Sequence, residues 1–485
     1  MSSIDITETG KKIFLTGVTG FVGMAVLEKI LRDQHDHVDS IYTLVRASKG
    51  ENPAARVEKV LCNPVFDTLR RSHPNFSSKV VAVEGDLSQD GLGLSEEDAS
   101  KLACEVKTII HCAASIEFCL PLKEAFGINT LGVVRLLELA DKCSNLEGIV
   151  HVSTAYVNCN LKNIVIEEKV YPITLGDPLY LVEHIPKVGQ PELDSLEKCV
   201  LKEYPNTYTF TKALTEHVLV SKSSRWNIAI VRPSIITSAI CSPTPGWIHG
   251  LAAIAGVSTL IGLGVVDVLP VQPQGVVDVV PVDYVASLVV GAMNIIKDQP
   301  GYKVYHATSS CINPLTWEMF RVGILGGWSK QTNLEKRVFP PNLDLIPDLN
   351  EFDERIKKTR QRMFSTEAYN MAKKDPAGAK KVLGMVGRID SSYKNFLFFG
   401  INQWIYKAHN VIDMESKQKL PANHVSRSVL ATMDWNEYLD NFTSGVRHFV
   451  LEKHLLPGAK EQTKEQPKSQ EPTLVDEQTT LDLKA

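Results

Sequence analysis

The chain has 485 residues, 44% of them hydrophobic and 22% charged, which are ordinary proportions for a soluble globular protein of two or three domains. This composition excludes a wholly disordered, a collagenous or a polytopic membrane protein. With 52 basic and 56 acidic residues the net charge is −4, so we expect no nucleic-acid partner. The nine cysteines form no CxxC pair and follow no signal peptide, which predicts reduced thiols and a cytoplasmic location.

The first half of the chain alternates short runs rich in Val and Ile with helical patterns. Six such runs have the character of buried strands, at residues 11–18, 40–45, 79–87, 106–114, 148–154 and 228–234. Helical patterns lie between most of them, for example at residues 20–32 and 131–143. Buried strands that alternate with helices predict a parallel sheet covered on both faces, and right-handed crossovers make it a doubly wound α/β fold of the Rossmann type.

After about residue 300 the pattern changes. Residues 317–380 are charged and helical, residues 395–406 are aromatic and apolar, and residues 433–456 have the pattern of an amphipathic helix. We therefore predict a first domain over residues 1–350, followed by a smaller helical C-terminal domain over residues 351–457.

Two segments differ in composition from their surroundings. Residues 458–485 are rich in Lys, Glu, Gln, Thr and Pro and cannot bury enough apolar area to offset their ordering entropy, so we predict a disordered polar tail. Residues 250–266 carry no charge and contain four glycines, but they are short for a membrane span and Asp267 follows at once. We favour a buried loop and helix there over a transmembrane helix, with an apolar wall for a lipid-like substrate as a third interpretation.

A glycine-rich motif, TGVTGFVG, follows the first strand and begins the first helix. Gly17 permits a tight turn, Gly20 lets the backbone approach a pyrophosphate, and Gly23 lets helix and strand pack closely. The helix N-terminus then offers free N–H groups to the anion. Between a strand and a helix this pattern favours a dinucleotide site over an ordinary glycine turn. The predicted contacts in this motif are Gly17, Thr19, Gly20, Phe21 and Gly23.

The residue after the second strand bears on the choice of cofactor. An NAD site usually has an acidic residue at this point, whereas this chain has Arg46. A guanidinium suits a 2′-phosphate, and Arg56 lies close by in the sequence. We therefore predict NADPH rather than NADH, with a solvent-exposed arginine as the alternative interpretation.

The ends of the next strands supply further predicted cofactor contacts. Asp86 and Leu87 close the third strand, where an adenine ring would lie. The small residues Ala113 and Ala114 close the fourth strand and leave room for the ribose and nicotinamide. Asn129 heads the next helical segment and is interpreted as its cap.

A candidate catalytic group follows the fifth strand. Tyr208 and Lys212 are four residues apart in a helical pattern, so both side chains share one face. A nearby ammonium lowers the pKa of a phenol, which predicts proton exchange near neutral pH, and Lys212 can also hold the nicotinamide ribose. Ser153 and Thr154 close the fifth strand, where a hydroxyl can hold a substrate carbonyl. Although the Tyr–Lys spacing alone is common in solvated helices, its place after a nucleotide motif favours carbonyl reduction.

Together these motifs resemble a known family. The segments TGVTGFVG, LVR, HCAASIEF, VHVSTAYVN, YTFTK and VRPSI are similar to those of the extended short-chain dehydrogenase/reductases. The later segments PGWIHG, VVDVVPVDYV, YHATSSCINPLTW and MDWNEYLDNFTSGVRHFVLEK narrow the resemblance to the fatty acyl-CoA reductases. The resemblance covers about residues 11–456.

The resemblance implies an activity and roles for single residues. The family reduces long-chain acyl-CoA thioesters to primary alcohols through an aldehyde, with two NADPH. Tyr208 would be the proton donor and Lys212 its activator, with both side chains also at the cofactor. Thr154 would hold the carbonyl, with Ser153 the weaker candidate, and Pro233 of VRPSI would lie at the cofactor.

The resemblance also implies a substrate and a location. The partner would be a long-chain acyl-CoA, with the uncharged residues 250–266 as an acyl-facing wall or a surface that touches a membrane. Animal members often end in hydrophobic membrane-spanning segments, whereas this chain ends in a polar tail, so we expect at most peripheral contact with an organelle membrane. Neither chain length nor oligomeric state follows from the sequence.

Three alternatives stay open. A reductase of carrier-bound thioesters that stops at the aldehyde has the same motifs, although it usually adjoins adenylation and carrier domains that this chain lacks. A sugar epimerase or steroid dehydrogenase shares the fold, but the apolar residues 250–266 weigh against a sugar substrate. A non-catalytic NADPH-binding protein is disfavoured by the intact Thr154, Tyr208 and Lys212. His35 and His37 lie in a loop, and we expect no metal site.

Overall fold

The computed structural model describes most of the chain between residues 10 and 452. The described residues are 10–48, 50–332, 334, 337, 339–364, 397–418 and 424–452. The predicted tail at residues 458–485 lies outside them, as do parts of the predicted C-terminal domain.

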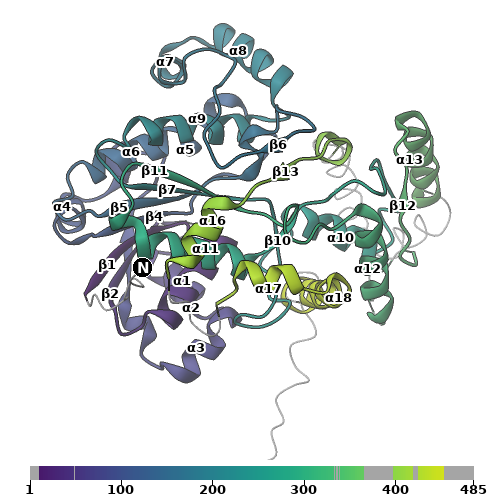
Figure 1. Cartoon of the computed structure of the whole chain (residues 1–485), viewed down its shortest axis with the longest axis horizontal. Coiled ribbons are helices and arrows are strands. Elements are labelled where there is room, and N and C mark those ends of the chain that lie inside the picture. Colours follow the sequence, from purple (N-terminus) through teal and green to yellow (C-terminus); the bar gives the residue numbers. More distant parts are fainter. Residues whose placement is uncertain are drawn as a thin grey trace, which may run out of the picture.

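A seven-stranded parallel sheet forms the centre of the molecule (Figure 1). In spatial order its strands are β11 (Tyr302–Ala307), β7 (Ile228–Pro233), β5 (Gly148–Val152), β4 (Thr108–His111), β1 (Lys11–Thr16), β2 (Val38–Val45) and β3 (Val80–Glu84). Each neighbouring pair is parallel. The strand order reverses between β1 and β4, and sheets of this kind bind ligands at the carboxyl ends of the strands at such a switch point. The predicted doubly wound fold is confirmed.

The sheet contains the six predicted strands and one more. Each of the six ends at or before the residue where the sequence placed its end. The additional strand, β11, was not predicted because its sequence YKVYHA carries a charged residue and two tyrosines in place of an aliphatic run. It is nevertheless buried over its second half, because α11 (Val282–Ile295) and α16 (His409–Ser416) pack against this edge of the sheet.

Helices cover both faces of the sheet, as the alternating side chains of β1 require. Ile13 and Leu15 point into one core layer and Phe14 into the other. The helices of the first layer include α1 (Phe21–Asp33) and α11, and those of the second include α4 (Glu96–Glu105), α6 (Leu131–Ala140) and α9 (Thr207–Ser221).

The remaining elements surround this core. Near the sheet lie α2 (Pro53–Leu61), α3 (Asp67–Ser72) and α5 (Leu122–Asn129), while α7 (Pro178–His184) and α8 (Gln190–Glu203) project at the top of Figure 1. Beyond the carboxyl ends of the strands lie α10 (Ile254–Gly262), α12 (Trp317–Lys330) and α13 (Leu349–Phe364). Short parallel pairs join β8 (Ile235–Thr237) to β10 (Val279–Pro281), β9 (Val268–Leu269) to β12 (Asp344–Leu345), and β6 (Val165–Ile166) to β13 (Ile405–Tyr406).

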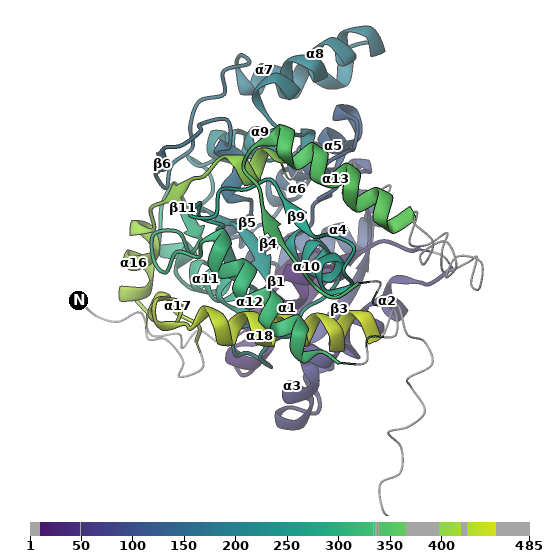
Figure 2. The same ribbon diagram turned by 90° about the vertical axis from the view of Figure 1, so that its right-hand side faces the viewer.

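Elements from the C-terminal part of the chain pack on the earlier ones. The predicted amphipathic helix is present as α18 (Trp435–Gly445), continued by a π-helical turn over Val446–Leu451, and it lies along α12 (Figure 2). The short helix α17 (Arg427–Thr432) precedes it. Strand β13 pairs with β6, and α16 packs on α11 and β11. The region is helical as predicted, whereas the domain boundary at residue 350 stays a prediction.

The uncharged residues 250–266 fold into a loop and the nine-residue helix α10. The interpretation as a loop and helix is therefore confirmed, and residues 261–266 are buried as expected, whereas the loop residues 251–253 are exposed. The helix ends at Gly262, where a Cβ would overlap the indole of Trp328. Within the part of the chain that the structure describes, no helix combines the length and apolarity needed to cross a membrane.

Candidate active site

The glycine-rich motif forms the turn between β1 and α1. Gly17 has a φ of +83°, and a Cβ there would lie 2.7 Å from the backbone nitrogen of Ala113. A Cβ on Gly23 would overlap the carbonyl of Gly17, so the close approach of helix and strand requires glycine at both positions. The structure therefore shows the tight turn at Gly17 and the close packing of helix and strand at Gly23 that were predicted from the sequence.

The same turn fits a pyrophosphate. Gly20 is the N-cap residue of α1 and offers no side-chain cap, so the first N–H groups of the helix have no cap partner. Thr19 and Gly20 are exposed, and Phe21 packs on Trp247 with ring centroids 5.2 Å apart. The N-terminus of α1 lies at the sheet's switch point and attracts an anion through its dipole.

Two guanidinium groups lie at the carboxyl end of β2. The Arg46 side chain is 70% exposed, with Nη1 3.8 Å from Oδ2 of Asp86. Nη1 of Arg56 donates to the carbonyl of Arg46 at 2.5 Å. Burial acts to raise the pKa of Asp86, but hydrogen bonds from Ser88 and the charge of Arg46 outweigh it, and the net pKa is lowered. This end of the sheet therefore offers two cations and one carboxylate to an adenosine group.

The other predicted cofactor residues lie at the carboxyl ends of the strands. Leu87 is buried beside Gly132, and the N–H of Ala113 donates to Oγ1 of Thr16 at 3.3 Å, with Ala114 next in the chain. Pro233 is the last residue of β7, and its carbonyl accepts a hydrogen bond from Oγ1 of Thr154 at 3.5 Å.

The interpretation of Asn129 as a helix cap is wrong. Its side chain is buried at the end of α5 and joins two elements of the site. Nδ2 donates to the carbonyl of Ser115 at 3.1 Å and to Oγ1 of Thr211 at 3.2 Å, while Oδ1 accepts from the N–H of Ser115 at 2.9 Å. Asn129 thus holds the loop after β4 against the helix that carries Tyr208.

Helix α9 brings Tyr208 and Lys212 to the end of β5. It begins after Asn206, whose side chain accepts a hydrogen bond from the N–H of Thr209. Nζ of Lys212 donates to the carbonyl of Val152 at 2.7 Å and lies 3.3 Å from Nε2 of His151. The phenol of Tyr208 hydrogen-bonds with Thr154. Tyr208 and Thr154 therefore meet, and Lys212 lies at the end of the same strand.

The pKa of Tyr208 differs from the prediction. Burial raises it to about 12, and the hydrogen bond with Thr154 only partly opposes this rise. The expected lowering by Lys212 is absent because the ammonium is held by the carbonyl of Val152 instead. Burial lowers the pKa of Lys212 to about 8, with the Glu216 carboxylate acting in the opposite direction. The phenol is thus protonated at neutral pH and able to donate its proton.

The two hydroxyls at the end of β5 have different partners. Ser153 donates its Oγ proton to Oε1 of Glu216 at 2.6 Å, and both side chains are buried. Thr154 instead contacts Tyr208 and lies beside the carbonyl of Pro233. Of the two, Thr154 alone is placed to touch a substrate bound at the phenol, which agrees with the order of preference given by the sequence.

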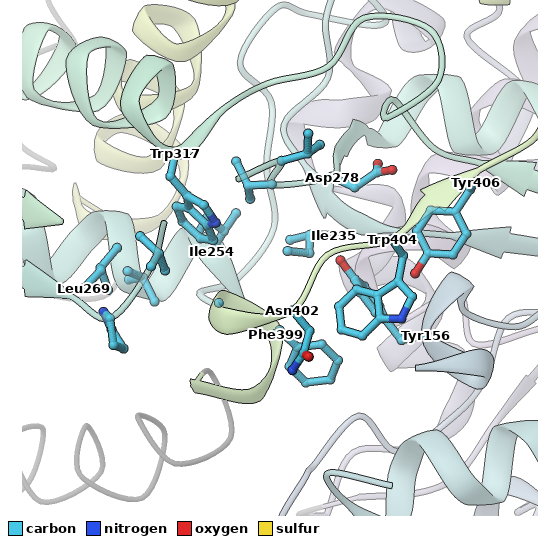
Figure 3. A pocket seen from close by; sticks show the side chains of 16 residues that line it. Tyr156, Ile235, Ile254, Leu269, Asp278, Trp317, Phe399, Asn402, Trp404 and Tyr406 are labelled. Atoms are coloured by element: carbon cyan, nitrogen blue, oxygen red, sulfur yellow. The ribbon is translucent and has the colours of Figure 1, made fainter. Parts of the chain in front are cut away.

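An apolar pocket, drawn in Figure 3, is lined in part by Tyr156, which lies two residues after Thr154 in the chain. Its lining residues are Tyr156, Ile235, Ile254, Val257, Leu269, Pro270, Val271, Val276, Val277, Asp278, Trp317, Phe399, Gly400, Asn402, Trp404 and Tyr406. Aromatic contacts join the pocket to Tyr208, because Phe118 packs on Tyr208 with centroids 5.7 Å apart and on Phe399 at 6.1 Å. Two members, Ile254 and Val257, come from the uncharged residues 250–266.

The pocket is nearly filled by its own side chains. Its volume of about 30 Å³ is enough for one water molecule. Phe399 packs edge-on against Tyr156 at 4.9 Å, and Trp404 packs edge-on against the same ring at 5.8 Å. An acyl chain therefore enters only if aromatic side chains such as these turn aside.

Comparison with known proteins identifies the family. A family model described as "Male sterility protein" matches residues 15–289. Fatty acyl-CoA reductase 1 of Mus musculus is 32% identical over 467 residues, covering 95% of this chain and 89% of the relative. Fatty acyl-CoA reductase 2 of Homo sapiens is 30% identical over 468 residues, covering 96% and 90%. This chain belongs to the fatty acyl-CoA reductase family.

Solved structures agree with the fold of this reductase. The terminal R domain from the myxalamid PKS-NRPS biosynthetic pathway superposes with a TM-score of 0.61 at 20% identity, covering 91% of this chain and 92% of that domain. The reductase domain of a nonribosomal peptide synthetase from Mycobacterium tuberculosis superposes with a TM-score of 0.57 at 17% identity, covering 92% and 94%. Family and fold together indicate a nicotinamide cofactor.

Much of the pocket in this reductase was not predicted from the sequence. Tyr156, Asp278 and Trp317 lie far apart in the chain and meet only in the folded molecule. One signal was present, since the aromatic and apolar residues 395–406 supply Phe399 and Trp404. That segment was singled out for its composition but was not assigned to the site.

Proposed function

We propose that the protein reduces long-chain acyl-CoA thioesters to primary alcohols with NADPH. The observation that carries the proposal is the protonated phenol of Tyr208, bonded to Thr154 and joined by aromatic contacts to an apolar pocket. The relatives named fatty acyl-CoA reductase 1 and 2, matched over nearly the whole chain, support the substrate class.

NADPH is favoured over NADH by the residues at the end of β2. The side chain of Arg46 is 70% exposed, and Arg56 donates a hydrogen bond to the carbonyl of Arg46. A 2′-phosphate bound between two guanidinium groups is recognised by charge and by paired N–H donors. Because its pKa is lowered, Asp86 is a carboxylate at this place. That carboxylate would repel the 2′-phosphate unless Arg46 stays paired with Asp86.

The residues of the site perform proton transfer twice in the proposed reaction. NADPH, when bound, supplies the hydride of each reduction. Thr154 and Tyr208 both donate hydrogen bonds to the thioester oxygen, and Tyr208 gives up its proton to form a hemithioacetal. The carbon–sulfur bond then breaks and CoA leaves as its thiol, which gives an aldehyde. The aldehyde oxygen takes a second proton from Tyr208, after the phenol has been reprotonated from solvent, and becomes the alcohol.

The test is NADPH oxidation with a series of acyl-CoA thioesters, with the products separated by chromatography. We expect two NADPH consumed per thioester and a primary alcohol as the end product. One NADPH and an accumulated aldehyde would instead indicate a reductase that stops after the first step.

The Tyr208→Phe variant tests the proton donor. We expect turnover of both thioester and aldehyde to fall by at least roughly 10³-fold, because Thr154 still donates a hydrogen bond to the substrate oxygen but the group that gives up its proton is lost. Binding of NADPH, measured by its fluorescence, should stay within about threefold of wild type. Retained turnover would remove Tyr208 from this role.

A further inference from the structure

A buried ion pair lies directly behind the catalytic group. Nε of Arg232 donates to Oε1 of Glu216 at 2.8 Å, and Nη2 donates to Oε2 at 2.5 Å. The Glu216 side chain is 1% exposed and that of Arg232 is fully buried. Oε1 of Glu216 also accepts the hydroxyl proton of Ser153. A bidentate pair with a third hydrogen bond compensates both buried charges.

Each partner of Glu216 adjoins a residue of the site. Ser153 precedes Thr154 at the end of β5, and Arg232 precedes Pro233 at the end of β7. Glu216 itself lies on α9 one turn after Lys212 and two turns after Tyr208, so the three side chains share one face of the helix. One carboxylate thereby ties two strand ends to the helix that carries the proton donor.

Among the described titratable groups that face Lys212, Glu216 is the carboxylate, and its charge raises the pKa of Lys212. On β4 and β5 these groups are His111, Cys112 and His151. Burial lowers the pKa of His111 to about 3 and that of His151 well below its ordinary value, and it raises the pKa of the Cys112 thiol to about 12, so all three are neutral. Tyr208, on the same helix, keeps its proton.

The charges beyond Glu216 come from β7 and β11. Arg232 pairs with Glu216 and lies 3.3 Å from Nε2 of His306, which is neutral because burial lowers its pKa to about 3. His217, next on α9, also has a lowered pKa because of burial. Glu216 is therefore the one carboxylate among the described residues whose charge acts on Lys212.

We propose that Glu216 is a positioning residue, which fixes the strand end that presents Thr154 and holds Lys212 as an ammonium. The inference rests on the proposed function, because it gives Glu216 a part in the same proton transfer. A positioning role for Glu216 differs from a purely structural one in one respect. Loss of the carboxylate then changes the pH at which Lys212 loses its proton.

The test compares Glu216→Gln with the matched variant Glu138→Gln, which changes an exposed carboxylate on α6. The readouts are the pH profile of kcat and the pH profile of NADPH affinity between pH 6 and pH 10. Wild type should lose activity and affinity above about pH 8, where Lys212 loses its proton. In Glu216→Gln we expect this alkaline limb to move down by about one pH unit. Glu138→Gln should match wild type.

A second variant separates positioning from folding. Glu216→Gln alone leaves Arg232 unpaired and is expected to lower stability. Glu216→Gln combined with Arg232→Gln removes both charges and restores a neutral pair. If Glu216 acts only on stability, the double variant recovers the wild-type profile, which would overturn the proposal. If the alkaline limb of the pH profile stays shifted in the double variant, the result supports the proposal.

The affinity profile keeps this inference distinct from the proposed function. Failure of wild type to turn over any acyl-CoA or aldehyde would disprove the activity, while the pH dependence of NADPH binding would still report on Lys212. An unshifted affinity limb in Glu216→Gln would overturn the role of Glu216 even if acyl-CoA reduction is found.

Discussion

Thr154 and Ser153 show how two adjacent hydroxyls acquire different roles. Both end the same strand, but alternation sends Ser153 toward Glu216 and Thr154 toward Tyr208. The sequence already favoured Thr154, through the family resemblance. The sequence could not show that the Ser153 hydroxyl is hydrogen-bonded to Glu216, because the two residues are 63 positions apart in the chain.

Thr154→Val tests the carbonyl-holding hydroxyl. The variant keeps the shape of the side chain and removes its donor, so turnover of butanal should fall by roughly 10²-fold, as when one donor to a developing oxyanion is lost. Thr154→Ser should keep most of the activity. NADPH oxidation measures both, and a loss smaller than threefold in Thr154→Val would contradict the assignment.

At the scale of elements, the segment around β13 joins the pocket to the sheet. Trp404 and Tyr406 line the pocket, while the carbonyl of Lys407 accepts from Nδ1 of His306 at 2.7 Å. The carboxylate of Glu168 accepts from the backbone N–H of His306 at 2.9 Å and from that of Asn410 at 2.5 Å. Glu168 therefore fixes both ends of this connection.

Glu168 makes stability depend on pH. Burial raises its pKa from 4.5 to about 7, against the opposing effect of the backbone donors. Its stabilising contribution is therefore fully present below pH 4.5 and is lost as the pH rises through 7, by up to about 3 kcal/mol. Glu168→Gln should flatten the fall in the free energy of unfolding between pH 5 and pH 8, measured by urea denaturation.

Glu167→Gln is the control for that measurement. Glu167 is the neighbouring residue, and its carboxylate lies at the surface in an ion pair with Lys407. Its loss should leave the pH dependence as in wild type. If the free energy of unfolding falls equally with pH in Glu168→Gln and in wild type, another group titrates between pH 5 and pH 8.

Helix α10 carries the predicted acyl-facing wall, but only one side of it faces the pocket. Ile254 and Val257 line the pocket, whereas Ile261 is part of the hydrophobic core near Trp328. The apolar character of the segment was evident from the sequence, but its orientation was not. The helix has only two polar residues, Ser258 and Thr259, and both are buried, so no polar face orients it toward solvent.

Val257→Asp places a charge in the pocket wall. We expect the ratio of palmitoyl-CoA to butanal turnover to fall at least roughly tenfold, because a buried carboxylate opposes an apolar chain but leaves the catalytic group intact. Val322→Asp, on the exposed side of α12, is the control and should keep the ratio. Equal loss for both substrates in Val257→Asp would count against the pocket as the acyl site.

For the whole molecule, local signals predicted the nucleotide half and not the substrate half. The glycine turn, the strand ends and the pair of Tyr208 and Lys212 lie in short motifs whose spacing fixes their geometry. The pocket instead combines side chains from β8, α12 and β13, whose placement depends on contacts over more than a hundred residues. A single sequence contains no periodicity that reports such pairings.

The packing of α18 on α12 is another such long-range contact, and glycines on α12 make it close. A Cβ on Gly327 would overlap the side chain of Thr443, and a Cβ on Gly323 would lie 2.5 Å from Leu439. Gly326, on the same helix, has nothing within 4 Å of its Cβ position. The two neighbouring glycines therefore predict opposite effects of the same substitution.

Gly326→Ala should stabilise the protein by about 0.5–1 kcal/mol, because alanine favours the helix and meets no neighbour. Gly327→Ala should destabilise it by about 1–3 kcal/mol, because Thr443 or the whole of α18 must move. Since Trp317 begins α12 and lines the pocket, Gly327→Ala should also lower palmitoyl-CoA turnover more than butanal turnover. Thermal unfolding and the two assays measure these effects. A melting temperature raised equally in both variants would show that α18 does not hold α12 in place.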